Sequence, residues 1–246
     1  MNYILYIFIL VMSFGCASTK VFQTYTGVSN GYGKASLPDA SIYSGEFKDG
    51  LFHGDGELVW SDGDIYKGHF ENGLLNGYGE FFFRDGSEYK GLYKNGLIHG
   101  KGKYTSNDGV IFEGDHFKGR TEGYGILIEP GIGIYEGQFL NGKYTGNGRH
   151  VSENGKIYEG EFKNGFWNGK GRLELPSGEI YTGEFKNGMH HGKGFVIFPN
   201  GDTFLGSFEF GMIEGKGACV VEGIAGKCIY EKGSFIEFIE GPQNET

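Results

Sequence analysis

The residues that could do chemistry are mainly histidines and acidic side chains, and their spacing does not gather them into a site. Three of the seven histidines, His53, His99 and His191, recur at one place of a repeated pattern where other copies carry Asn, Thr or Glu. At ordinary strand spacing His53 and His99 would lie about 20 Å apart, too far to share one metal ion. The segment Asp62–Asp64 supplies only part of a calcium loop. We therefore expect no metal and no cofactor.

The glycine-rich segments do not indicate a nucleotide site or an enzyme. Glycine pairs such as Gly54 and Gly56 recur through the chain, and no helical pattern follows them. The chain has no phosphate-binding Gly-x-x-x-x-Gly-Lys-Ser/Thr loop. No local cluster of reactive residues interrupts the repeated pattern. We therefore expect a binding or scaffolding surface and no catalytic activity.

Composition excludes several other classes of protein. Glycine supplies 48 residues and proline only 5, which excludes collagen-like and proline-rich disordered chains. The 16 tyrosines and 22 phenylalanines are too many for a disordered chain. A net charge of −9, without a run of basic residues, gives no general attraction to nucleic acid or anionic lipid. We expect short strands joined by tight turns, and no nucleic-acid partner.

The N-terminus carries a short apolar run, Tyr3 to Met12, which is shorter than the roughly 20 residues that a membrane-spanning helix needs. The run and the Gly15-Cys16 pair that follows resemble a bacterial lipoprotein signal, in which the cysteine is acylated and becomes the first mature residue. Ser13 stands where that signal usually has leucine, and no Lys or Arg precedes the run. The alternatives are a plain secretory signal or a buried strand with an ordinary cysteine.

The lipoprotein resemblance implies a signal peptide over residues 1–15, lipidation of Cys16, and a lipid-anchored protein of the cell envelope. Ala17 stands where an aspartate would mark inner-membrane retention, so a two-membrane bacterium would carry the protein on the periplasmic face of the outer membrane or on the cell surface. Export would place Cys219 and Cys228 in an oxidising space, where a disulfide can form between them. Two free thiols are the alternative. Redox chemistry is not expected, because the Cys-x-x-Cys spacing is absent.

A repeat of 23 residues accounts for most of the chain. Its position 1 is always aromatic: Tyr43, Tyr66, Tyr89, Phe112, Tyr135, Tyr158, Tyr181 and Phe204. Position 3 is always glycine, position 5 is aromatic except for His116, and positions 8, 12 and 14 are glycine. Atypical segments flank the eight repeats, as the ends of a stacked array require. The downstream segment, Tyr230–Phe235, is interpreted as a truncated repeat that begins at Tyr230 with one extra residue.

The motif Tyr-x-Gly-x-Phe-x-x-Gly-x-x-x-Gly-x-Gly resembles the MORN repeat (membrane occupation and recognition nexus). The resemblance implies an all-β fold: an elongated single twisted antiparallel sheet of tandem β-hairpins. It also implies protein contacts and dimer formation, and phospholipid binding has been proposed for the family. The expected organisation is a signal peptide (1–15), a lipidated N-terminus with a degraded capping repeat (16–42), eight repeats (43–229), and a truncated repeat with a tail (230–246).

The local pattern explains how each repeat forms a hairpin. Tyr-x-Gly-x-Phe alternates with a period of two, so the two rings and the glycine share one face of a strand. Glycine between the rings leaves room for them, although it weakens a strand elsewhere. A second strand closes on Asp62-Gly63 or its equivalents, which predict a primed two-residue turn. Each repeat is therefore expected to be one antiparallel hairpin.

Variable aromatic residues are the candidates for an interaction surface, since the rings at positions 1 and 5 are expected to pack the repeats together. Phe166 and Trp167 fall at expected loop positions and should be exposed, and Trp60 is a further candidate on a second strand. The favoured function is a membrane-tethered scaffold for a protein partner that the sequence does not identify. Homodimer formation is a further expectation from the family resemblance.

Direct phospholipid binding through the repeat surface is the alternative function. Net charge argues against it, but basic residues recur at position 6 beside the turns: Lys48, Lys94, Lys163 and Lys186. Such a line of lysines would bind anionic headgroups in a manner that weakens with salt.

Overall fold

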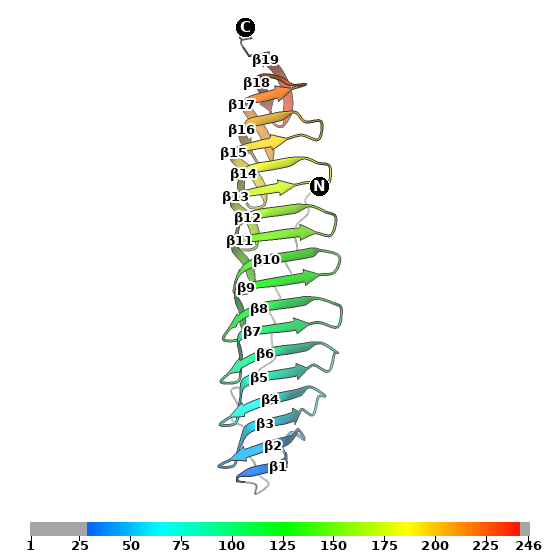
Figure 1. The fold of residues 1–246 in the computed structure, drawn as a ribbon, viewed down its shortest axis with the longest axis vertical. Helices are drawn as coiled ribbons and strands as arrows, with labels where there is room; N and C mark the ends of the chain where they lie inside the picture. Colours follow the sequence, from blue (N-terminus) through cyan, green and yellow to red (C-terminus); the bar gives the residue numbers. More distant parts are fainter. Residues whose placement is uncertain (1–28, 242–246) are drawn as a thin grey trace. The chain divides into compact units, whose positions relative to one another are not determined.

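The chain folds into strands throughout the region that the structure describes. The structure is a computed structural model that describes residues 29–241 (Figure 1). This region has nineteen strands and no helix, and hydrogen bonding assigns the strands to one antiparallel sheet. The prediction of an all-β antiparallel sheet of tandem hairpins is therefore confirmed. Contacts divide the chain into two parts, which are described separately.

The N-terminal part consists of the residues up to Pro130 together with Phe139–Gly142. Its strands are β1 (Gly31–Ser36), β2 (Ile42–Lys48), β3 (Leu51–Val59), β4 (Ile65–Glu71), β5 (Leu74–Phe82), β6 (Glu88–Lys94), β7 (Leu97–Thr105), β8 (Ile111–Phe117) and β9 (Arg120–Glu129). Each strand pairs antiparallel with the next one in the sequence, so two strands form each repeat.

The C-terminal part consists of Gly131–Gln138 and the residues from Lys143 onward. The remaining strands are β10 (Gly133–Leu140), β11 (Lys143–Ser152), β12 (Ile157–Lys163), β13 (Phe166–Glu174), β14 (Ile180–Lys186), β15 (Met189–Ile197), β16 (Thr203–Glu209), β17 (Met212–Val221), β18 (Ile224–Glu231) and β19 (Ser234–Glu240). From β11 to β19, successive strands again pair antiparallel.

A register shift inside each hairpin lets a single sheet bury its own rings. Gly45 pairs with Gly56, but the next residue, Glu46, pairs with His53, so β3 has two extra residues. Such a bulge bends the strand. It brings Phe52 over the Tyr43 ring, where the two rings stack with centroids 3.7 Å apart and planes 10° from parallel. Both side chains are 0% exposed, although no second sheet covers them in the described region.

The repeated glycines make room for the position-1 rings. A Cβ added at Gly56 would lie 2.4 Å from the Tyr43 hydroxyl oxygen, closer than any real contact. The same hydroxyl donates a hydrogen bond to the Glu46 carbonyl oxygen over 2.9 Å. All eight position-1 residues are buried: Tyr43, Tyr66, Tyr89, Phe112, Tyr135, Tyr158, Tyr181 and Phe204. The repeat motif is therefore a packing motif.

The primed two-residue turns lie at the opposite end of each hairpin from the one predicted. At Asn72-Gly73 both residues have positive φ, 51° and 77°, as a type I′ turn requires. At Asp62-Gly63 only the glycine has positive φ, and Gly63 N–H donates to the Trp60 carbonyl oxygen. The prediction for Asp62-Gly63 was wrong, because a longer turn joins one repeat to the next there and needs a single left-handed residue.

The type I′ turns inside the repeats, such as Asn72-Gly73, also reach back to the preceding repeat. Gly73 N–H donates to the Phe52 carbonyl oxygen over 2.8 Å, and Gly96 N–H donates to that of Leu75 over 2.9 Å. The same bond recurs in the C-terminal part, for example from Gly188 N–H to the Trp167 carbonyl oxygen. These bonds satisfy turn groups that would otherwise face only solvent.

Strand register corrects the interpretation of the last repeat. Cys219 pairs with Gly226 and Gly215 pairs with Tyr230, as Leu58 pairs with Tyr66 and Gly54 with Phe70 in the first repeats. Gly226 therefore holds position 1 and Tyr230 holds position 5, so Tyr230 does not begin the repeat as predicted. The sequence comparison was misled because the ninth repeat has no ring at position 1.

Candidate interaction surfaces

The predicted aromatic pair Phe166 and Trp167 does not lie in a loop. These residues begin β13, directly after a type I′ turn. The Trp167 ring is half-buried and stacks on Tyr158 with centroids 4.5 Å apart and planes 9° from parallel. Trp167 thus takes the packing place that Phe52 has in the first repeat. Only Phe166 is well exposed, so the expectation of an exposed pair in a loop was wrong.

Trp60 is also a packing residue in part. It is half-buried, and its ring centroid lies 5.2 Å from that of Phe81. Phe81 in turn contacts Phe83 at 4.5 Å. These rings cover the ends of the second strands in the N-terminal part.

The predicted signal peptide and Cys16 lie outside the described residues. Their acylation therefore stays a prediction. Within residues 29–241, no apolar helix is long enough to cross a membrane.

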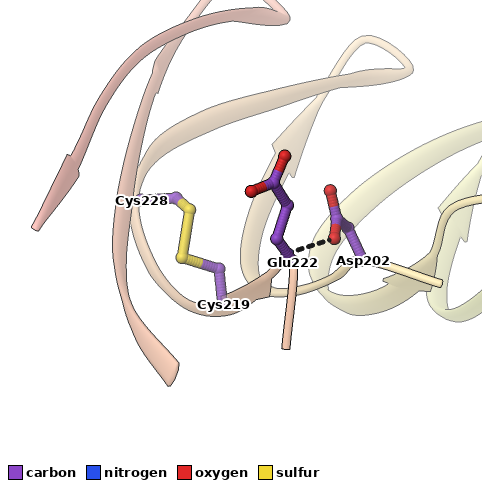
Figure 2. Close-up of a disulfide and its surroundings, with 4 residues drawn as sticks. All are labelled: Asp202, Cys219, Glu222 and Cys228. Atoms are coloured by element: carbon purple, nitrogen blue, oxygen red, sulfur yellow. Dashed lines mark hydrogen bonds between the residues drawn. A yellow bond between two sulfur atoms is a disulfide. The ribbon is translucent and has the colours of Figure 1, made fainter. Parts of the chain in front are cut away.

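Cys219 and Cys228 are joined by a disulfide across the β17–β18 hairpin (Figure 2). Their Cα atoms are 5.8 Å apart, and the turn between them is Glu222-Gly223. Beside the disulfide, Glu222 N–H donates to Asp202 Oδ1 over 2.8 Å (Figure 2). Cys228 holds position 3, where other repeats need glycine to clear the position-1 ring. The side chain fits here because Gly226 brings no ring.

The buried histidines pack against aromatic rings, as phenylalanine or tyrosine does at the same positions of other repeats. His116 holds position 5 in the fourth repeat and contacts Phe112 at a centroid distance of 5.2 Å. His190 stacks on Tyr181 at 3.8 Å. Burial lowers the pKa of each imidazole to about 4, so both are neutral near pH 7. Among the residues that the structure describes, no three His, Cys, Asp or Glu side chains are grouped to hold a metal ion.

The sequence contains one motif that is typical of some hydrolases, but the strand-to-helix turn that this motif requires is not formed. Gly27 to Gly31 spells Gly-x-Ser-x-Gly, the pattern of a nucleophile elbow, which needs a turn from a strand into a helix. Strand β1 begins at Gly31 instead, and the Ser29 carbonyl oxygen accepts a hydrogen bond from Gly50 N–H. Within the described residues, a strand and not a helix therefore follows Ser29.

The outer face of the sheet, opposite the rings, carries alternating charges in the N-terminal part. One row across the strands reads Glu57, Lys67, Glu80 and Lys90. Lys67 Nζ lies 2.7 Å from Glu57 Oε2, and Lys90 Nζ lies 3.9 Å from Glu80 Oε2. Exposed pairs of this kind add little to the stability of a fold and keep the face hydrated.

The same row becomes apolar in the C-terminal part. It reads Arg149, Glu159, Arg172, Thr182, Phe195, Leu205, Ala218 and Lys227, so its apolar members lie on β15, β16 and β17. Phe195 is 36% exposed and Leu205 is 55% exposed. The adjacent row adds two further aliphatic side chains. We call this surface the outer patch and define it as Phe195, Ile197, Leu205, Ala218 and Val220.

The outer patch is not among the surfaces expected from the sequence, where the candidates were the variable aromatic residues and the lysines at position 6. The sequence could have indicated it, because outward positions of β15 and β16 are the apolar residues Phe195, Ile197 and Leu205.

The chain is an array of tandem β-hairpin repeats, and it belongs to the MORN repeat family. The family model matches more than half of the chain, at residues 43–65, 66–88, 89–111, 135–157, 158–180, 181–203 and 204–220. The matching model describes a structural repeat and no catalytic domain. A comparison with curated proteins gave no match.

Solved structures show only distant likeness. The TCP10 domain of Danio rerio CPAP is 10% identical, with a TM-score of 0.46, over 85% of this chain and 100% of that chain. The SAS-4 (dCPAP) TCP domain of Drosophila melanogaster, in complex with a proline-rich motif of Ana2, is 10% identical, with a TM-score of 0.39, over 72% and 90%. At these values the likeness carries no argument about function.

Proposed function

We propose that this protein is a non-catalytic scaffold that binds a protein partner through the outer patch. The observation that carries the proposal is the change along one row of the outer face, from paired charges to Phe195 and Leu205. Exposed apolar side chains that lie side by side on a sheet favour burial against another protein. The charged row gives no such gain, because its groups are already hydrated and paired.

The test of this proposal compares two glutamates on the outer face. Leu205→Glu places a charge in the outer patch, whereas Leu92→Glu places the same charge on an exposed leucine of β6, outside the patch. We expect Leu205→Glu to abolish a specific cross-link in envelope extracts, while Leu92→Glu keeps it. Quantitative cross-linking mass spectrometry measures both. Retention of all cross-links in the Leu205→Glu variant would refute the proposal.

The scaffold is further proposed to be tethered to the envelope membrane through acylated Cys16. The resemblance of residues 1–16 to a lipoprotein signal supports this, and the Cys219–Cys228 disulfide fits an oxidising compartment. Intact-mass spectrometry should find a diacylated or triacylated N-terminal cysteine, and Cys16→Ala should release the protein from membranes. An unmodified Met1 in the soluble fraction would overturn the tether.

Phospholipid binding is the second candidate, and one observation favours it. Lys48, Lys94, Lys163 and Lys186 are all exposed beside type I′ turns. Liposome flotation of protein without the lipid anchor should then depend on anionic lipid and weaken steeply with salt. Flotation that is equal with neutral and anionic vesicles would remove this candidate.

A homodimer is also proposed from the family resemblance. Sedimentation velocity over a range of concentrations should show a dimer, and a monomer at all concentrations would refute it.

A further inference from the structure

In the first, fifth, sixth and seventh repeats, positions 1, 5 and 10 all carry rings, and the position-1 ring stacks on the position-10 ring. In the first repeat the position-1 ring, Tyr43, contacts Phe47 at position 5 with centroids 5.1 Å apart and stacks on Phe52 at position 10 at 3.7 Å. The Phe47 and Phe52 rings lie 5.7 Å apart and nearly perpendicular, at 73°. The position-1 ring therefore fills the space beside two rings that its own hairpin presents.

The ninth repeat keeps two of these rings and lacks the third. Tyr230 and Phe235 occupy positions 5 and 10, and their rings lie 5.5 Å apart at 75°, nearly the geometry of Phe47 and Phe52. Position 1 is Gly226, which has no side chain. Phe235 is 51% exposed, whereas Phe52, which also contacts Phe70 of the following repeat, is 0% exposed.

A cavity opens beside this incomplete set of rings. Its volume is about 520 Å³, within the range of ligand pockets. Its wall consists of Phe198, Pro199, Asn200, Asp202, Thr203, Val221, Tyr230 and Phe235. Most of that wall is apolar, and the rings of Tyr230 and Phe235 form one side of it. An apolar wall with aromatic rings on one side suits a flat aromatic side chain.

Asp202 adds a polar requirement to the cavity. Its carboxylate accepts hydrogen bonds from Glu222 N–H and from Asn200 Nδ2, each over 2.8 Å. A carboxylate can accept about four hydrogen bonds, so it can also accept one from a ligand. Burial raises the pKa of Tyr230, and the negative charge of Asp202 raises it further. A ring with a hydrogen-bond donor, such as tyrosine or tryptophan, therefore fits the cavity better than phenylalanine.

Strand β19 offers backbone for pairing at the same end of the C-terminal part. Within the described residues it pairs with β18 along one edge, so a further strand could add along the other edge. Phe235 and Ile236 are exposed on it, and it contains no proline or lysine that would discourage strand addition. Strand β1 differs, since it carries Gly31, Gly33 and Lys34.

Charge indicates what kind of strand would add there. Residues 202–240 contain seven carboxylate side chains and three lysines. A segment with lysine or arginine beside its aromatic residue is attracted to this surface, whereas an acidic one is repelled.

We propose that the C-terminal end binds an extended basic segment of another protein, which pairs with β19 and places one tyrosine or tryptophan side chain in the cavity. This inference rests on the proposed scaffold function but concerns a surface that shares no residue with the outer patch. The experiments can therefore refute one proposal without refuting the other.

The test uses labelled peptide probes and fluorescence anisotropy. The probe is Lys-Val-Lys-Val-Tyr-Val-Lys-Val-Lys, with companions that carry tryptophan or alanine in place of tyrosine, or N-methyl groups on alternate backbone amides. We expect saturable binding of the tyrosine and tryptophan probes. The alanine and N-methylated probes should bind at least tenfold more weakly, and binding should weaken with salt.

Two matched variants locate the site. Val221→Phe fills the cavity with the residue that Phe83 and Phe198 supply at the same place of other repeats, so the fold should tolerate it. Leu175→Phe makes the same kind of change two repeats away, outside the cavity wall. Val221→Phe should weaken the tyrosine probe at least tenfold, and Leu175→Phe should change its affinity less than twofold. Circular dichroism checks that both are folded, and Phe235→Ala, which removes one wall, provides a second route to the same loss.

Three results would overturn the inference. They are no saturable binding of either aromatic probe, equal affinity for the tyrosine and alanine probes, and a wild-type dimer that Val221→Phe dissociates, which would assign the end to a second copy of the chain. The Leu205→Glu variant should bind the probe normally, which separates this site from the outer patch.

Discussion

The seventh and ninth repeats differ at position 1, and the difference separates a fully packed repeat from one that leaves an aromatic side chain exposed. In the seventh repeat, Tyr181 contacts Phe185 at 5.1 Å and stacks on His190. In the ninth, Gly226 brings no ring, and Phe235 is left half in solvent. The residues by which the family is recognised are thus the buried ones, and both proposed binding surfaces lie where the sequence departs from the common pattern.

The largest expected contrast comes from removing a ring in each of these repeats. Tyr181→Ala should lower the free energy of unfolding by about 3–5 kcal/mol, because it deletes a fully packed ring. Phe235→Ala should cost less than about 1 kcal/mol, because half of that side chain is already exposed. Urea denaturation followed by circular dichroism measures both. Equal losses would show that the ninth repeat is packed like the seventh.

The second contrast adds a methyl group instead of removing a ring. A Cβ at Gly194 would lie 2.4 Å from the Tyr181 hydroxyl oxygen, so Gly194→Ala should destabilise by about 3 kcal/mol. At Gly215 nothing lies within 4 Å of an added Cβ, but φ is 76°, so Gly215→Ala should cost about 1 kcal/mol through backbone strain. Thermal unfolding of the two variants should rank them in this order. A milder effect at Gly194 would mean that the ring can move aside.

The third prediction concerns the covalent link that accompanies Gly226. Replacing Cys219 and Cys228 together by serine should lower the free energy of unfolding by about 2–3 kcal/mol, the value for a loop of this length. Hydrogen exchange should quicken in β17 to β19 and stay unchanged in β11 to β13. A variant with uniform exchange behaviour and unchanged stability would show that the disulfide is dispensable.

The smallest expected effect is a pH dependence from the histidines that replace rings. Unfolded histidine takes up a proton near pH 6.5, whereas buried His116 and His190 do so only near pH 4. Between these values the unfolded chain binds more protons, so stability falls as the pH falls. His116→Phe should remove about 1–2 kcal/mol of this loss between pH 6.5 and 4. The exposed His69→Phe change is the control, and an unaltered pH profile in the His116→Phe variant would contradict the assignment.

Much of the fold can be predicted from the sequence because every repeat shows the same packing requirement. A ring at position 1 needs glycine at positions 3 and 14, and each copy shows this again, so the eight hairpins can be identified by counting. The residues of the outer face vary from repeat to repeat, so counting does not identify a surface there. Only the strand register shows that Phe195 and Leu205 are neighbours.

The errors in the prediction share a cause. Asp62-Gly63 and Asn72-Gly73 look alike as letters, but the chain on either side determines whether one or two residues turn left-handed. Tyr230 looks like a position-1 residue because it is aromatic, yet the cross-strand pairing with Gly215 places it at position 5. Three-dimensional neighbours, which a single sequence does not list, decide both cases.

The bond from each turn glycine to the preceding repeat gives the array a direction. Gly73 N–H needs the carbonyl group of Phe52, and Gly96 N–H needs that of Leu75, so each turn is completed by a group made earlier in synthesis. A chain that emerges from the ribosome N-terminus first therefore always presents a finished hairpin as the template for the next one. Truncation from the C-terminus therefore removes turns but leaves the acceptor carbonyl groups of every remaining turn in place. Deletion of an early repeat removes the acceptor that the next turn needs.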